Sequence, residues 1–154
     1  MLPAALVALT LTLPQHGLVV PGRTFGGVAL GASKALVERA WGTRHGTCSG
    51  CARPTWYFTY QRFEPQGAGV SFHNGKADSF FTLWAPDGWH TNRGLKVGDS
   101  EERVGALYGV LPRAECGTYS AFVLRRGRTD TQIYVHEQQV WGFGLSPAGA
   151  PPCH

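Results

Sequence analysis

Two segments of the chain carry the same spaced residues, and this internal repeat restricts the architectures open to the chain. The segments span residues 27–42 and 94–109, at an offset of 67 residues. Glycine, serine, valine, an aromatic residue and glycine recur at that offset: Gly31, Ser33, Val37, Trp41 and Gly42 match Gly98, Ser100, Val104, Tyr108 and Gly109. A duplicated segment predicts a duplicated structural unit.

Each repeated segment has the pattern of a short helix. Ser33 is placed to cap the first helix, and Asp99 or Ser100 the second, with Glu102 at capping-box spacing from Asp99. The valine and the aromatic residue then share one helical face, and the final glycine is typical of a helix end. Helices of about three turns at most are marginal alone, so each must pack on a sheet.

Strand-forming runs follow each helix. Asn74-Gly75 separates two of these runs and is a strong hairpin signal. The runs cover residues 55–60, 69–73 and 76–84 in the first half, and 119–124, 132–136 and 140–145 in the second. We therefore predict an α+β fold of two tandem modules, each a helix followed by a three-stranded antiparallel sheet. The two sheets are expected to pair edge to edge or to form one continuous layer.

The predicted boundaries are a signal peptide at 1–20, a first module at 21–86 and a second at 87–154, the modules forming one compact unit. The apolar run at 1–13 is too short to cross a bilayer and fits a signal-peptide core, with a buried first strand or helix as the alternative. We expect an exported protein, secreted or in the cell envelope, with no transmembrane span after signal removal.

The four cysteines are expected to form two disulfides, as is usual in exported chains. We favour Cys48–Cys51 and Cys116–Cys153, because Cys153 lies in a tail with little structural propensity that a bond to Cys116 would anchor. The alternative is a zinc or thiol site, since His45, Cys48 and Cys51 form H-x-x-C-x-x-C and His73 could be a fourth ligand. With the disulfide reading favoured, no cofactor is expected.

Catalytic patterns are missing from the sequence. It contains no G-x-S-x-G, no H-E-x-x-H and no phosphate-binding glycine loop. His73 and His136 precede corresponding hairpin turns and are interpreted as solvent-facing. The formal charge of +4 comes from dispersed residues, apart from Arg125, Arg126 and Arg128, so nucleic acid is not an expected partner.

Aromatic residues make up 12% of the chain and are concentrated in the strands. One face of each sheet must pack under the helices, and the other face could then present aromatic area to a partner. The residues assigned to this binding surface are Tyr57, Trp84, Trp89 and Trp141. Coverage of both faces is the alternative.

The repeated G-x-S-x-x-x-V-x-x-x-aromatic-G pattern resembles the helical start of two related groups. They are the SmpA/OmlA (BamE-like) outer-membrane lipoproteins and the secreted tandem-repeat β-lactamase inhibitory proteins. The resemblance implies short helices laid on an antiparallel sheet, and no contact residue carries over from either group. We expect a non-enzymatic exported binding or scaffold protein with a protein partner, the alternatives being the metal or thiol site and a secreted enzyme inhibitor.

Overall fold

The structure, a computed structural model, describes residues 17–48, 50–59 and 67–154. Most of the regular structure is strand, and the helices α1 (Lys34–Trp41) and α2 (Glu101–Tyr108) have eight residues each. The predicted α+β fold of helix-then-three-strand modules is therefore wrong. The repeated pattern covers the two helices, which are a small part of the structure. Several strands have only two or three residues, and such strands are too short to show a two-residue period in the sequence.

One antiparallel sheet of eight strands dominates the chain. Its order is β3-β4-β5-β6-β11-β10-β9-β8, so two four-stranded meanders meet where β6 pairs with β11. The first meander consists of β3 (Gly46–Cys48), β4 (Thr55–Phe58), β5 (Ala68–His73) and β6 (Lys76–Thr82). The second consists of β8 (Arg113–Glu115), β9 (Ser120–Arg126), β10 (Thr129–His136) and β11 (Gln139–Pro147). The expectation that strands of both halves form one continuous layer is confirmed.

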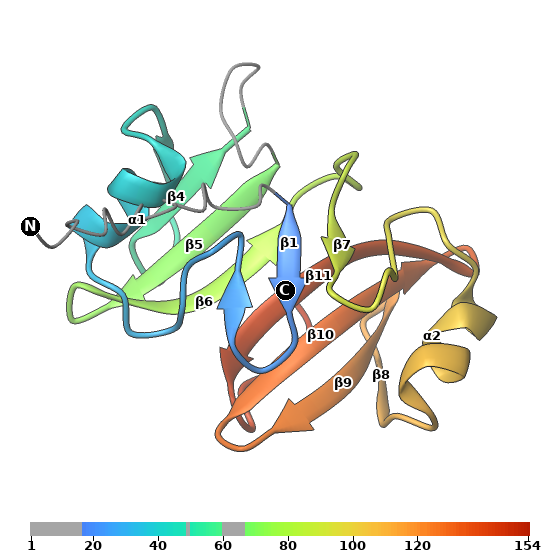
Figure 1. Cartoon of the computed structure of the whole chain (residues 1–154). Coiled ribbons are helices and arrows are strands. Elements are labelled where there is room, and N and C mark those ends of the chain that lie inside the picture. Colours follow the sequence, from blue (N-terminus) through green and yellow to red (C-terminus); the bar gives the residue numbers. More distant parts are fainter. Residues whose placement is uncertain (1–16, 49, 60–66) are drawn as a thin grey trace, which may run out of the picture.

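A small second sheet joins the two halves on one face of the large one. It contains β1 (Leu18–Val20), β2 (Thr24–Phe25) and β7 (His90–Thr91), in the order β2-β1-β7. Figure 1 shows α1 and α2 toward opposite ends of the large sheet, with β1 and β7 between them. Among the described residues, one hydrophobic core includes Val37 of α1, Val104 of α2 and Val19 of β1.

Aromatic rings fill the centre of this core. Trp41 of α1 meets Phe58 edge-on at 5.2 Å between ring centroids, and Phe25 stacks on Phe80 at 5.8 Å. Trp89 lies 4.6 Å from Phe25. Because Phe58 and Phe80 belong to the large sheet, this sheet face is the one covered by the helices and β2.

The helix ends follow the sequence signals in part. Ser33 caps α1, its hydroxyl accepting the Leu36 N–H at 3.2 Å, and Gly42 and Gly109 end the two helices with positive φ. The capping box expected from Asp99 and Glu102 is not formed. Ser100 is the N-cap residue, and Asp99 instead accepts a hydrogen bond from the Lys96 N–H.

Matching backbone hydrogen bonds attach the start of each repeated segment to a hairpin. Ala77 donates to Ala32 at 2.8 Å in the first half, and Val140 donates to Asp99 at 2.7 Å in the second. Both hairpins also contain a bulge, between Ser71 and Phe72 in one and beside Tyr134 in the other. The start of each helix therefore meets its hairpin through an equivalent backbone contact.

Strand β1 lies within the range 1–20 predicted as a signal peptide. It pairs with β2 and β7, and Val19 is completely buried. Cleavage after residue 20 would remove a strand of the core, whereas the apolar run at 1–13 lies outside the described residues.

Candidate functional site

The face of the large sheet opposite the helices carries a row of aromatic residues separated by glycines. Cross-strand pairing places Tyr57 beside Gly69, Gly69 beside Phe81, and Phe81 beside Gly144. A Cβ atom on Gly69 would lie 2.5 Å from the Phe81 ring. The glycines therefore allow aromatic rings to lie close against the sheet backbone.

Two pockets open on this face and share a wall made by Leu83 and Trp84. The larger, of about 460 Å³, lies toward β3, and the smaller, of about 190 Å³, lies over β11 and β10. We call the two together the aromatic groove. Its described lining is Gly46, Thr47, Tyr57, Thr59, Phe81, Thr82, Leu83, Trp84, Tyr119, Tyr134, Trp141 and His154. None of these described lining side chains is an Asp, Glu, Lys or Arg.

Trp84 is the most exposed aromatic feature of the groove. Its side chain is 78% exposed, and both Trp84 and Ala85 have positive φ, at 51° and 46°. Two successive non-glycine residues in this region are costly, and such strain is concentrated at functional sites. The chain thus holds a large apolar side chain in solvent at the expense of backbone energy.

Tyr134 gives the groove a polar group without a partner. The residue is 4% exposed, and among the described residues its hydroxyl has no hydrogen bond. Burial raises the pKa of Tyr134 well above its usual value, so the phenol stays protonated and can donate. A buried unpaired hydroxyl is unfavourable, and a ligand acceptor would remove that cost.

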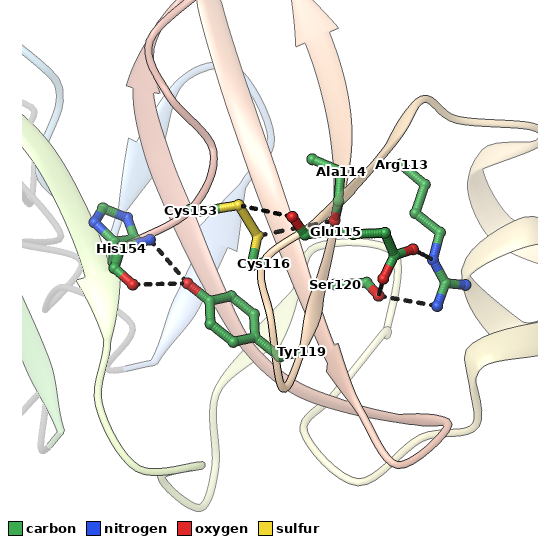
Figure 2. Close-up of a disulfide and its surroundings, with 8 residues drawn as sticks. All are labelled: Arg113, Ala114, Glu115, Cys116, Tyr119, Ser120, Cys153 and His154. Carbon is green, nitrogen blue, oxygen red and sulfur yellow. Dashed lines mark hydrogen bonds and ion pairs between the residues drawn. A yellow bond between two sulfur atoms is a disulfide. The ribbon is translucent and has the colours of Figure 1, made fainter.

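His154 lines the smaller pocket, and Figure 2 shows it beside Tyr119 and the disulfide between Cys116 and Cys153. Cys153 is bonded to Cys116, and the next residue, His154, donates its N–H to the Tyr119 hydroxyl at 2.8 Å. The His154 ring lies 5.1 Å from the Phe81 ring, and burial lowers the pKa of His154. The disulfide therefore holds the His154 ring at the end of the groove.

The other disulfide borders the opposite end of the groove. Cys48 and Cys51 are bonded, and the Cys51 sulfur lies 3.5 Å from the Tyr57 hydroxyl. The two disulfides have the pairing favoured from the sequence. One disulfide therefore lies beside each end of the aromatic groove.

Three of the four residues assigned to the binding surface line this groove, namely Tyr57, Trp84 and Trp141. The assignment of Trp89 is wrong, because Trp89 is 1% exposed and packs on Phe25 in the core. The segment around Trp89 folds back against the small sheet, because β7 pairs with β1 and Trp89 packs on Phe25 of β2. Four further groove residues were not predicted from the sequence: Phe81, Tyr119, Tyr134 and His154. Phe81 follows a core residue in a strand, so it points to the opposite face, and His154 follows a disulfide-bonded cysteine; these two positions could have been found.

The residues of the predicted zinc or thiol site are not arranged for metal binding. Cys48 and Cys51 share a disulfide, and His45 stacks on Trp56 at 3.8 Å while bonding Glu38 at 3.2 Å. His73 is exposed at the end of β5. In the part of the chain that the structure describes, no three His, Cys, Asp or Glu side chains form a metal-binding group.

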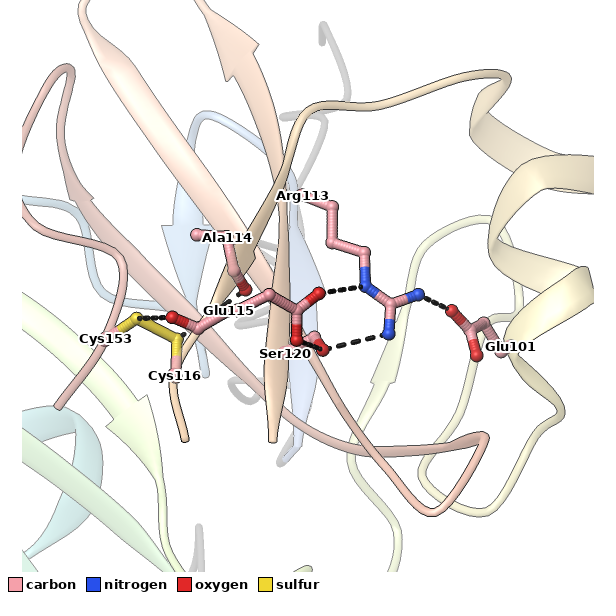
Figure 3. A network of polar contacts seen from close by, with 7 residues as sticks. All are labelled: Glu101, Arg113, Ala114, Glu115, Cys116, Ser120 and Cys153. Carbon is pink, nitrogen blue, oxygen red and sulfur yellow. Dashed lines mark hydrogen bonds and ion pairs between the residues drawn. A yellow bond between two sulfur atoms is a disulfide. The ribbon is translucent and has the colours of Figure 1, made fainter. Parts of the chain in front are cut away.

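A separate polar cluster links α2 to the edge of the large sheet (Figure 3). The Arg113 guanidinium contacts Glu101 of α2 and Glu115 of β8, and it donates to Ser120 of β9 at 2.9 Å. The hydrogen bond from Ser120, followed by that from Arg113, lowers the pKa of Glu115. Both carboxylates pair with the single guanidinium of Arg113, so this cluster holds α2 against the edge of the sheet.

The fold has parallels among solved structures, although no family model and no curated protein matches the chain. A cysteine-rich secretory protein from Staphylococcus aureus has a TM-score of 0.55 at 12% identity, covering 83% of this chain and 46% of its own. A DUF4309 family protein from Bacillus subtilis has a TM-score of 0.49 at 14% identity, covering 75% and 78%. The chain thus spans less than half of the staphylococcal protein, and at this identity the likeness shows the fold alone.

The SmpA/OmlA-like and inhibitor-like resemblance stays a prediction. Two disulfides, both bordering the groove, are compatible with an exported protein. The two described helices are each far shorter than a bilayer-spanning helix.

Proposed function

We propose that this chain is an exported, non-enzymatic protein that binds an extended segment of a partner protein in its aromatic groove. The observation that carries the proposal is Trp84, held in solvent between two pockets by a strained backbone. Tryptophan and tyrosine are the side chains most enriched at the energetic centres of protein interfaces.

A polypeptide is favoured by the edge strand beside the larger pocket. Gly46 and Thr47 of β3 line that pocket, and within the described residues β3 pairs only with β4. An edge strand offers backbone groups to an added strand, whose alternate side chains would then point into the groove. Since the described lining is largely aromatic and contains no Asp, Glu, Lys or Arg side chain, uncharged apolar side chains fit it best, with an acceptor for the Tyr134 hydroxyl.

Export is part of the same proposal. The disulfides that flank Tyr57 and His154 form in oxidising compartments. The staphylococcal protein of similar fold is described as secretory. We propose location in the cell envelope or exterior, with any signal cleavage before β1. Inhibition of a secreted enzyme, as the family resemblance implies, would be one form of such binding.

A binding experiment with the immobilised protein tests the proposal by comparing wild type with the variants Trp84→Ala and Val110→Ala. Val110 is a fully exposed apolar residue outside the groove, which makes it a matched control. A protein recovered from the secreted fraction by wild type is identified, purified and titrated against all three chains. Loss of an interface centre costs about 2 kcal/mol or more, so Trp84→Ala should raise Kd about 30-fold, while Val110→Ala leaves it unchanged.

Two outcomes would overturn the proposal. One is equal affinity of the purified partner for wild type and Trp84→Ala. The other is binding of oligosaccharides, and of no protein, at the groove, since flat aromatic rings can also stack on sugars.

A further inference from the structure

A further pocket, on the opposite side of the sheet from the aromatic groove, is lined by three arginines from three separate parts of the chain. Arg23 lies in the turn between β1 and β2, Arg93 in the turn after β7, and Arg126 at the end of β9. The pocket has a volume of about 400 Å³. Its remaining lining is Val20, Pro21, Gly22, Asn92 and Tyr108, and we call it the arginine pocket.

The backbone around the arginine pocket is held by specific contacts. The Gly22 N–H donates to the Thr131 hydroxyl at 2.8 Å, which fixes the β1–β2 turn on β10. The turn lies directly on Arg126, because a Cβ atom on Gly22 would be 2.6 Å from the Arg126 Cβ. The Asn92 N–H donates to the Val19 carbonyl at 3.1 Å and fixes the turn that carries Arg93.

Tyr108 forms a wall of the pocket and orients one arginine. The Arg93 guanidinium lies over the Tyr108 ring at 5.4 Å, and the Tyr108 hydroxyl donates to Thr91 at 2.7 Å. The ring is therefore anchored at its polar end. The Tyr108 ring therefore positions the Arg93 guanidinium by contact with its face, and the N–H donors of Arg93 are not used on a carboxylate of the described residues.

The charges of the arginine pocket are not compensated within the described residues. The lining contains no Asp or Glu, and none of the three arginines forms an ion pair there. The contrast with Arg125 is direct, since this neighbour of Arg126 donates two hydrogen bonds to Asp130, at 2.8 and 2.9 Å. Three cations around one cavity repel each other, and a bound anion would relieve that repulsion.

We infer that the arginine pocket binds a phosphate ester. Guanidinium groups match the geometry of phosphate oxygens through paired N–H donors, and three of them suit a multiply charged group. The pocket volume falls in the range of small-molecule sites, about 300–1,000 Å³, so it has room for an organic group beside the phosphate. Val20, Pro21 and the Tyr108 ring supply the apolar wall for that group.

Titration calorimetry of the full chain with glycerol phosphate, at low and high salt, tests this inference. Uncharged glycerol serves as the ligand control, and Arg23→Gln, Arg93→Gln and Arg126→Gln remove one guanidinium each. Each variant should weaken binding about tenfold or more, because a hydrogen bond to a charged group is lost. Arg128→Gln removes an exposed charge from the same hairpin outside the pocket and should change affinity less than about twofold.

A second arm uses vesicles containing phosphatidylglycerol, compared with vesicles of neutral lipid. Arginine-dependent binding of glycerol phosphate identifies a soluble ester, and arginine-dependent binding of the anionic vesicles alone identifies a lipid headgroup; both support the inference. Absence of binding in both arms, or equal loss with Arg128→Gln, would overturn it. Trp84→Ala should leave this binding intact, so failure here and failure of the aromatic groove are distinguishable.

Discussion

Replacement of Gly144 by alanine tests how the aromatic groove is built. A Cβ atom at this position would lie 2.4 Å from the Tyr134 hydroxyl oxygen and 2.7 Å from the Gln132 side-chain oxygen. Tyr134 is 4% exposed and Gln132 is 1% exposed, so neither can swing into solvent. The added methyl must therefore displace buried side chains.

The expected cost follows from these contacts. Overpacking in a filled site costs about 1–3 kcal/mol, and the entropy lost from the unfolded chain on replacing glycine returns about 0.4–1 kcal/mol. We expect Gly144→Ala to lower the free energy of unfolding by about 1–2 kcal/mol. For a chain of this size that is a fall in Tm of about 3–8 °C.

Thermal and denaturant unfolding of a small set of variants measures the effect. Gly105→Ala is the matched control, because nothing lies within 4 Å of its added Cβ in α2, and it should gain about 0.5–1 kcal/mol. Tyr134→Phe removes the nearer of the two opposing oxygens. In that background, Gly144→Ala should cost clearly less, with a coupling of about 0.5 kcal/mol or more.

Two results would refute the reasoning about Gly144. One is a Gly144→Ala protein as stable as wild type. The other is the same loss with and without Tyr134→Phe, which would mean that the hydroxyl does not set the limit.

Three further predictions concern stability. Asp130→Asn should lower the free energy of unfolding by about 1.5–3 kcal/mol, because Asp130 accepts charged hydrogen bonds from Arg125. The same bonds lower the pKa of Asp130, so wild type should lose their contribution as the pH falls below about 4, whereas the variant should not; unfolding measured across an acid titration checks this. Replacing Cys116 and Cys153 together by serine should lower the free energy of unfolding in denaturant by about 4 kcal/mol, and replacing Cys48 and Cys51 should lower it by about 1.5 kcal/mol. A disulfide stabilises more when it closes a longer loop, and the sequence separations are 37 and 3 residues; equal losses would contradict this reasoning. A chain starting at residue 21 lacks β1 and the buried Val19, so it should be less stable than one starting at residue 17 by several kcal/mol, about 2–5 for the buried apolar side chains alone; circular dichroism melts compare the two, and equal Tm values would exclude a structural role for β1.

Local signals in the sequence predicted local structure well. Ser33 and Gly42 mark the ends of α1, and Asn74-Gly75 is the hairpin turn between β5 and β6. These features depend on residues within a few positions of one another, where backbone preference and capping decide the outcome.

Features that depend on distant contacts were not predictable in the same way. Strands β1, β2 and β7 are two or three residues long, and they form only because the large sheet covers them. Trp89 and Trp84 look alike as aromatic residues near one loop, yet packing on Phe25 buries the first. Of the arginine cluster noted at 125–128, only Arg126 lines the arginine pocket, and its companions lie far away in the sequence.

The pairing of β6 with β11 has a consequence for how the chain is made. β6 ends at Thr82, and the strand that covers its open side begins only at Gln139. During synthesis or export the first meander therefore carries an uncovered edge for the time that more than fifty further residues take to emerge. Incomplete chains that lack β11 would expose the free edge of β6, and two such chains could pair through these edges. Rapid completion of the hairpin of β10 and β11 would therefore limit aggregation.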